Sequence, residues 1–355
     1  MSAPAGRRRP TPYEVFFRLV FARMDPERAH GFAYHAIRLL PILGIGSVVS
    51  RFTRPDPVLA TRALGLSFPS PFGLAAGFDK EARIIRGLGQ LGFGHVEVGT
   101  ITALEQPGNP QPRLFRLIAD RAVINRMGFN NAGAKAASGE LRVARRRSHR
   151  PVIGVNIGKS RVVDLDAAAA DYHESARLLA SYADYLVINI SSPNTPGLRA
   201  LHDLDRLQPV IDAVRSEAGS VPLLVKISPD VTDEDARELG AFAVSSGLDG
   251  VIATNTTIGR SGLRTPEAVV EAAGAGGLSG RPLAARSIEV LRLLRASVPA
   301  DFCIISVGGV ETAADVQRRL DAGATLVQGY TGFLYRGPFW AHSINRGLAR
   351  IRRSH

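Results

Sequence analysis

The chain has 355 residues, of which 45% are hydrophobic and 6% aromatic, and its 44 basic and 32 acidic residues give a formal net charge of +12. That length suits one large domain or two ordinary ones, and the single cysteine, Cys303, excludes an internal disulfide framework. The basic excess indicates no nucleic-acid partner, because the cluster at residues 145–150 contains no aromatic side chain, and no stretch approaches the ~20 apolar residues that cross a bilayer.

The first elements that the sequence predicts are two short helices. Apolar residues recur at helical spacing between residues 17 and 24 and between 32 and 39, and Asp25-Pro26 ends the first helix and starts the second. Arginines 7–9 precede both helices. Short apolar helices behind a basic segment are typical of an element that lies on an anionic membrane surface, although helices that simply pack on a barrel would show the same pattern.

From residue 72 onward, short apolar runs that end in small or polar residues alternate with helical stretches. Near-continuous apolar strands that alternate with amphipathic helices indicate a parallel sheet covered by helices. Eight such units favour an α/β fold of the (β/α)8 TIM-barrel class, in which the loops after the strands form the active face. The eight predicted strands are residues 72–79, 93–100, 152–158, 185–192, 222–228, 249–255, 302–309 and 324–331.

One connection is too long for a simple barrel loop. Residues 107–131 lie between the second and third predicted strands, and their alternating apolar residues predict an inserted β-hairpin that turns at Asp120-Arg121. Long insertions on the active face of a barrel often form walls or lids.

Asparagines recur at the ends of the predicted strands. Asn156, Asn189 and Asn255 end three of them, and Asn125 and Asn194 lie on neighbouring loops. Turn chemistry explains one or two asparagines at such positions but not five. Because an amide offers donors and an acceptor without charge, the set favours a planar heterocyclic ligand such as a pyrimidine.

Lysines and glycines complete the predicted site. Lys80 and Lys226 follow the first and fifth strands, where a cation neutralises a carboxylate or stabilises charge on a cofactor ring. Gly280, Gly308-Gly309 and Tyr330-Thr331 come late in the barrel, where phosphate commonly binds. Phosphate, a cation and amides together indicate flavin mononucleotide (FMN) rather than a dinucleotide, because no early strand is followed by GxGxxG.

Two other kinds of site have no support in the sequence. The eight histidines are scattered without an HExxH motif, so we expect no metal. Ser192 has no G-x-S-x-G context, so a Ser-His-Asp triad is not indicated.

The motifs taken together resemble the class 2 dihydroorotate dehydrogenases, which are membrane-associated and quinone-linked. The resemblance covers residues 13 to about 350, in the order of the family. It rests on the matching segments AAGFDK (75–80), EVGT (97–100), NRMGFNN (125–131), VINISSPNTPGLR (187–199), VKISPD (225–230), ATNTT (253–257), GGLSGRPL (276–283) and SVGGV (306–310), with DPERAH (25–30) in the leader.

The resemblance implies one FMN per chain and the oxidation of dihydroorotate to orotate in pyrimidine biosynthesis, with a membrane quinone as electron acceptor. It implies FMN contacts at Ala76, Gly77, Phe78, Asp79, Lys80, Thr100, Asn156, Asn189, Lys226, Thr254, Gly280, Gly309, Tyr330 and Thr331. It implies substrate contacts at Lys80, Asn125, Arg126, Met127, Gly128, Phe129, Asn189, Asn194, Asn255 and Thr256.

The resemblance also implies that Ser192 is the base that removes the C5 proton while hydride leaves C6 for flavin N5. A hydroxyl is a poor base, so Thr195 and a water are expected to relay the proton while Phe129 excludes bulk solvent. Ser191 is the rival base, but adjacent side chains of a strand point to opposite faces, and position in the family motif favours Ser192.

In the family pattern, residues 1–50 form a membrane-associating extension and residues 51–355 the FMN-binding barrel. His30, Arg116 and Tyr330 are expected to lie near the quinone entrance. We expect a monomer bound peripherally to the cytoplasmic face of a bacterial inner membrane. Two alternatives remain: another flavin barrel that uses fumarate or NAD, and a non-catalytic phosphate-binding barrel attached to membranes through its leader.

Overall fold

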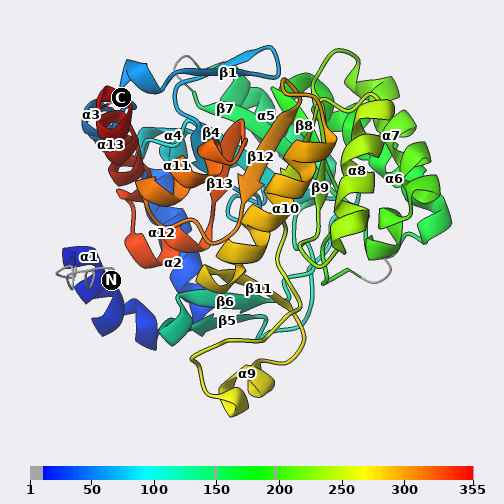
Figure 1. Ribbon diagram of the computed structural model, residues 1–355. Helices are drawn as coiled ribbons and strands as arrows, with labels where there is room; N and C mark the ends of the chain where they lie inside the picture. Colours follow the sequence, from blue (N-terminus) through cyan, green and yellow to red (C-terminus); the bar gives the residue numbers. More distant parts are fainter. Residues whose placement is uncertain (1–10, 148–149, 196–197, 355) are drawn as a thin grey trace.

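The computed structural model describes residues 11–147, 150–195 and 198–354. Its centre is a closed barrel of eight parallel strands in the order β10-β12-β13-β3-β4-β7-β8-β9, which confirms the predicted fold class (Figure 1). Each of the eight predicted runs overlaps a barrel strand. The strands are β3 (Phe72–Leu74), β4 (His95–Ile101), β7 (Val152–Ile157), β8 (Tyr185–Asn189), β9 (Leu223–Ile227), β10 (Gly250–Ala253), β12 (Cys303–Val307) and β13 (Leu326–Gly329).

Helices cover the outside of the barrel, so the strands are buried on both faces. Every residue of β4, β8 and β9 is buried, which explains why these runs are mostly apolar rather than alternating. The helices are α4 (Ile85–Gln90), α5 (Gly133–Arg145), α6 (Ala168–Leu179), α7 (Leu204–Ala218), α8 (Asp233–Ser245), α9 (Glu267–Ala273), α10 (Ala284–Ser297), α11 (Ala313–Asp321), α12 (Thr331–Arg336) and α13 (Trp340–Arg353).

Local sequence signals start several of these helices. The side-chain hydroxyls of Thr232 and Thr312 each accept a hydrogen bond from the backbone N–H of an aspartate three residues later. The carboxylate of that aspartate in turn accepts a hydrogen bond from the threonine backbone N–H. Short 3₁₀ segments connect other elements: η1 (Phe21–Arg23), η2 (Pro57–Leu59), η3 (Ile118–Asp120), η4 (Leu165–Ala167), η5 (Ala180–Tyr182), η6 (Leu198–His202) and η7 (Arg281–Leu283).

The inserted hairpin is confirmed. Strands β5 (Leu114–Leu117) and β6 (Ala122–Asn125) pair antiparallel, and Arg121 takes the left-handed conformation at the turn. A third strand, β11 (Gly277–Gly280), pairs with β6 and was not predicted, because a glycine-rich segment carries no strand pattern of its own. This small sheet lies at one end of the barrel (Figure 1). A separate hairpin of β1 (Thr61–Ala63) and β2 (Leu66–Phe68) was also not predicted.

The N-terminal region contains three helices rather than the predicted two. Helices α1 (Pro12–Leu19) and α2 (Pro26–Leu39) correspond to the predicted pair, and Thr11 and Asp25 cap them. The additional helix, α3 (Ile45–Thr53), follows Gly44, whose positive φ of 74° turns the chain into it. Arginines 7–9, which the sequence places before these helices, lie outside the described residues.

Large apolar side chains of these three helices and the segment between them face outward. They include Phe16, Leu19, Phe32, Leu39, Ile42, Leu43, Ile45, Val48 and Phe52. In the parts of the chain that the structure describes, none of the helices combines the length and apolar character needed to cross a bilayer.

Candidate functional site

A cavity of about 1310 Å³, counting the part open to solvent, lies at the carboxyl ends of the barrel strands. It is bounded by the barrel rim, the β5-β6-β11 sheet and helix α2. Most of the predicted site residues line it: His30, Ala76, Gly77, Lys80, Thr100, Asn125, Met127, Gly128, Phe129, Asn189, Ser192, Asn194, Lys226, Thr254, Asn255, Thr256, Gly280, Gly309, Tyr330 and Thr331. Residues more than 250 positions apart therefore converge on one space, as the barrel topology predicts.

Six predicted site residues do not line the cavity: Phe78, Asp79, Arg116, Arg126, Asn156 and Thr195. Asp79 is fully buried and accepts hydrogen bonds from the backbone N–H groups of Arg83 (3.0 Å) and Ile84 (2.9 Å), and burial raises its pKa to about 6. Phe78 packs against Phe333 and His30, with ring centroids 5.1 and 4.7 Å apart. Both residues thus support the loop after β3 from behind.

Asn156 acts one layer below the cavity. Its Oδ1 accepts a hydrogen bond from Thr100 Oγ1 (2.6 Å), and its Nδ2 donates to Glu97 Oε1 (2.7 Å). Asn189 Nδ2 donates to Thr100 Oγ1 (2.9 Å) and to Asn156 Oδ1 (3.2 Å). These bonds orient the Thr100 hydroxyl and the Asn189 amide, which do line the cavity.

Glu97 is a residue that the sequence interpretation missed. It points into the barrel centre, where it is 1% exposed and accepts hydrogen bonds from Lys226 Nζ (3.2 Å) and Gln328 Nε2 (2.9 Å) as well as from Asn156. The available signal was a glutamate in the middle of an apolar strand, since a carboxylate there requires a buried partner. The ion pair holds the Lys226 side chain, which lines the cavity.

Lys80 lies at the opposite wall. Its ammonium donates to Asn130 Oδ1 (2.9 Å), and burial, followed by the nearby Arg113 guanidinium, lowers its pKa to about 8. The lysine is therefore largely protonated at neutral pH and places a cation at this wall of the cavity.

Helix α2 contributes two further cavity residues, Glu27 and His30. Glu27 forms a 2.7 Å ion pair with Arg113, a contact that sequence reasoning missed. Burial, and to a smaller extent the charge of Lys80, lowers the pKa of His30 to about 4, so the imidazole is neutral at physiological pH. Arg116, predicted near the quinone, donates to the backbone carbonyls of Phe21 and Met24 and so holds η1 against β5.

The loop after β8 carries the two candidate serines. Ser192 lines the cavity, whereas Ser191 is fully buried and does not. Ser191 Oγ instead donates to Asn189 Oδ1 (3.3 Å) and accepts from Asn255 Nδ2 (3.1 Å). Thr195 Oγ1 is buried and has no hydrogen-bond partner among the described residues. Of the two serines, Ser192 is therefore the one that faces the cavity, although both lie beyond the end of β8, in a loop where strand alternation does not apply.

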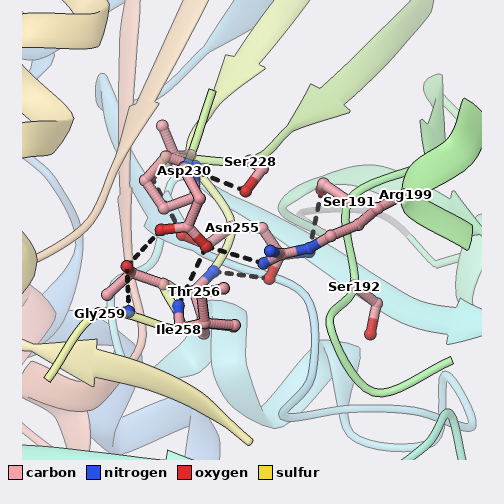
Figure 2. Close-up of polar contacts among 12 residues, drawn as sticks. Ser191, Ser192, Arg199, Ser228, Asp230, Asn255, Thr256, Ile258 and Gly259 are labelled. Carbon is pink, nitrogen blue, oxygen red and sulfur yellow. Dashed lines mark hydrogen bonds and ion pairs between the residues drawn. The ribbon is translucent and has the colours of Figure 1, made fainter. Parts of the chain in front are cut away.

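An ion pair ties the far end of this loop to the barrel rim. Arg199 pairs with Asp230 at 2.9 Å, and Asp230 also accepts hydrogen bonds from the Thr257 hydroxyl and from the backbone N–H of Ile258 (3.0 Å). Figure 2 shows Arg199 directed at this network while the Ser192 side chain points away from it. The loops after β8, β9 and β10 are therefore connected to one another at the barrel rim.

On the other side of the cavity the backbone packs closely at three glycines, Gly77, Gly280 and Gly309, which together form what we call the glycine cradle. A Cβ on Gly309 would lie 2.5 Å from Ala284 Cβ, and one on Gly280 would lie 2.4 Å from the Arg121 carbonyl oxygen. A Cβ on Gly77 would meet the Tyr330 ring at 3.3 Å. Backbone N–H groups in such a cradle suit a phosphate, and Lys226, Thr100 and Asn189 suit a polar ring, so the residues fit an FMN.

Within the described ranges, no group of three or more histidine, cysteine, aspartate or glutamate side chains is arranged to hold a metal ion.

Comparison with known proteins agrees with this arrangement. The family model "Dihydroorotate dehydrogenase" matches residues 58–351. A "Dihydroorotate dehydrogenase (quinone)" of Clavibacter michiganensis subsp. michiganensis (strain NCPPB 382) is 65% identical over 342 residues, which is 96% of this chain and 99% of that protein. One of Leifsonia xyli subsp. xyli (strain CTCB07) is also 65% identical, over 96% of this chain and 99% of its own length.

A solved structure gives the same result for the fold. The ligand-free dihydroorotate dehydrogenase of Eimeria tenella superposes with a TM-score of 0.82 at 40% identity, over 93% of this chain and 96% of that one. Identity of this extent, together with a cavity that gathers the family's motifs, shows that the chain belongs to the quinone-dependent, class 2 dihydroorotate dehydrogenases.

Proposed function

We propose that this dihydroorotate dehydrogenase binds one FMN per chain in the cavity and that Ser192 is the base that removes the C5 proton of dihydroorotate. The observation that carries the proposal is that Ser192, Lys80 and Asn255 line the same cavity as the glycine cradle and Lys226. When bound, FMN supplies the ring nitrogen N5 that accepts the C6 hydride.

Each residue has a distinct task on the substrate side. The Lys80 ammonium pairs with the substrate carboxylate, and the amides of Asn125, Asn194 and Asn255 hydrogen-bond the polar edges of the pyrimidine ring. Asn194 Nδ2 already donates to Asn125 Oδ1 (3.3 Å), so these two amides act as a unit from the loop after β8 and the end of β6. Phe129, beside them, covers the reacting atoms and excludes water.

Ser192 needs an acceptor for its hydroxyl proton, because a hydroxyl acts as a base only when it gives up that proton to another group. The position of Thr195 supports its part in this proton transfer. Its hydroxyl is buried on the same loop as Ser192 and has no hydrogen-bond partner among the described residues, so it is free to bond the serine or a water. The proton passes from C5 to Ser192 Oγ, and the serine proton passes through Thr195 and a water to solvent.

The test compares the two serines. Ser192→Ala should still bind orotate but reduce its flavin about 10²- to 10⁴-fold more slowly with dihydroorotate, the usual contribution of a positioned base. Ser191→Ala, which removes a hydroxyl outside the cavity, should lose less than about tenfold by the same criterion. Anaerobic stopped-flow bleaching of the flavin measures both, and a near-normal rate in Ser192→Ala would show that another group is the base.

We further propose that residues 1–50, comprising α1, α2 and most of α3, are the membrane-associating extension and that residues 51–355 form the barrel. The exposed apolar side chains of α1–α3 support peripheral binding to an anionic membrane surface, on the cytoplasmic face of a bacterial inner membrane. The quinone enters between α1 and α2 toward His30, Tyr330 and Arg116. The enzyme acts as a monomer.

A further inference from the structure

Arg319 is a buried cation whose position the reaction does not explain. It comes from α11, is 1% exposed, and is among the largest fully buried side chains. Burial lowers its pKa to about 10, so the guanidinium remains charged at neutral pH.

The partners of Arg319 are all uncharged. It donates to Ser306 Oγ (2.7 Å), to Ser287 Oγ (2.9 Å) and to the carbonyl oxygen of Gly308. Among the described residues it forms no ion pair, and Asp315, four positions earlier on the helix, instead pairs with Arg318 and bonds the Thr312 backbone. A buried charge that only neutral oxygens solvate is unfavourable unless an anion lies near.

The bond to Gly308 also fixes the direction of the next peptide group. In a planar trans peptide, C=O and N–H point to opposite sides. Because the Gly308 carbonyl faces Arg319, the N–H of Gly309 faces away from it, on the side of the cavity that Gly309 lines. No acceptor for the Gly309 N–H occurs within the described part of the chain.

Arginines surround the carboxylate that lies near this turn. Glu311, two residues beyond Gly309, is the one carboxylate at this end of the cavity among the described residues, and it pairs with Arg121 (2.8 Å), Arg281 (3.0 Å) and Arg336 (3.1 Å). The surroundings of the turn therefore favour an anion and do not repel one.

We propose that Arg319 is a positioning residue for the flavin phosphate: from behind the Gly308-Gly309 turn it aims the Gly309 N–H at the phosphate and supplies an unpaired positive charge beneath it. The inference rests on the proposed FMN, since it assigns a further residue to the phosphate end of that ligand. Arg319 does not touch the ligand itself but acts through the Gly308 carbonyl.

The experiment compares FMN with riboflavin, which lacks the phosphate. The purified holoenzyme is equilibrated with mixtures of both flavins and rapidly desalted, and the bound flavins are quantified by chromatography. Arg319→Gln keeps hydrogen-bond donors but removes the charge, and it should lower the preference for FMN over riboflavin by at least about tenfold, as expected for loss of a buried charge near an anion. Arg319→Lys keeps the charge and should stay within about tenfold of the unmodified enzyme.

Arg318→Gln is the matched control, because Arg318 is the exposed neighbour on the same helix and its ion pair, within the described chain, is with Asp315. Its flavin preference should not change. A smaller decrease than tenfold in Arg319→Gln, including equal weakening of both flavins, would overturn the inference and leave Arg319 a structural residue. If Arg319→Gln does not fold, Arg319→Lys decides alone, since a loss beyond about tenfold would contradict a role for the charge. An unmodified enzyme that holds no flavin would instead refute the proposed FMN.

Discussion

At the scale of single residues, the cavity separates its two lysines by environment. Lys226 lies in the barrel interior beside the Glu97 carboxylate (3.2 Å), whereas the hydrogen-bond partner of Lys80 among the described residues is the neutral Asn130. Burial and Arg113 lower the pKa of Lys80 to about 8. The charge of Lys80 therefore changes near physiological pH.

This difference predicts a pH dependence of orotate binding. The protonated lysine attracts the carboxylate and the neutral lysine does not, so orotate affinity should be full below the pKa and decrease as pH rises through about 8. Between pH 7 and pH 9 the dissociation constant should increase about tenfold. Orotate titrations followed by the flavin absorption spectrum measure it. Lys80→Met should bind weakly at both values, and equal affinity of the unmodified enzyme at both would contradict the role of Lys80.

At the scale of elements, the N-terminal helices have two different faces. One face docks on the barrel: Phe17 of α1 packs against Tyr335 with ring centroids 5.1 Å apart, and Ile37 of α2 is buried in the main core. The other face leaves large apolar side chains in solvent, among them Val48 (58% exposed) and Phe52 (71% exposed) on α3. An apolar surface of this extent on short helices fits the interface of a membrane.

Replacing that outer face should weaken membrane binding without affecting the barrel. Val48→Asp combined with Phe52→Asp should reduce cosedimentation with anionic lipid vesicles by about tenfold or more. The reason is that the two apolar side chains, which would move from water into the membrane interface, are replaced by charged ones. The free energy of unfolding should change by less than about 0.5 kcal/mol per exposed site. Val162→Asp, at a loop residue that is 80% exposed, is the control and should bind vesicles normally. Unchanged vesicle binding of the double variant would exclude α3 from the membrane face.

At the scale of the whole molecule, one polar cluster joins strands around the barrel. Glu97 of β4 accepts hydrogen bonds from Asn156 of β7, Lys226 of β9 and Gln328 of β13. The Glu97 and Lys226 side chains are 0% and 5% exposed, so neither charge is solvated by water. The cluster therefore links the packing of the barrel to the floor of the cavity.

Breaking this cluster should destabilise the barrel. Glu97→Gln places an amide group opposite three donors and leaves Lys226 as an uncompensated buried charge, which should cost about 3–5 kcal/mol of unfolding free energy. Urea denaturation of flavin-stripped protein measures the loss. Adding Lys226→Met to Glu97→Gln removes the uncompensated charge of the lysine and should recover part of the lost unfolding free energy. A loss below about 1 kcal/mol in Glu97→Gln alone would contradict the prediction and show that water solvates the lysine.

Much of this architecture is determined locally and was predicted from the sequence. The eight barrel strands and the hairpin of β5 and β6 were predicted because each is a short apolar run followed by turn or helix signals. The same ordering of motifs predicted that Lys80, Ser192 and Asn255 share one cavity, since the carboxyl ends of parallel strands meet at one rim.

Other features depend on partners that are distant in the chain. Strand β11 forms because β6, more than 150 residues earlier, offers it an unpaired edge, and no pattern in a glycine-rich segment predicts that pairing. Asp79 bonds backbone N–H groups rather than facing the cavity, and Ser191 is occupied by Asn189 and Asn255. The sequence by itself determined the barrel and the family, and it predicted which side chains gather at the barrel rim. Only the tertiary structure decided which polar side chains face the cavity and which hold the others in place, because a hydrogen bond depends on the position of its partner and not on its distance along the chain.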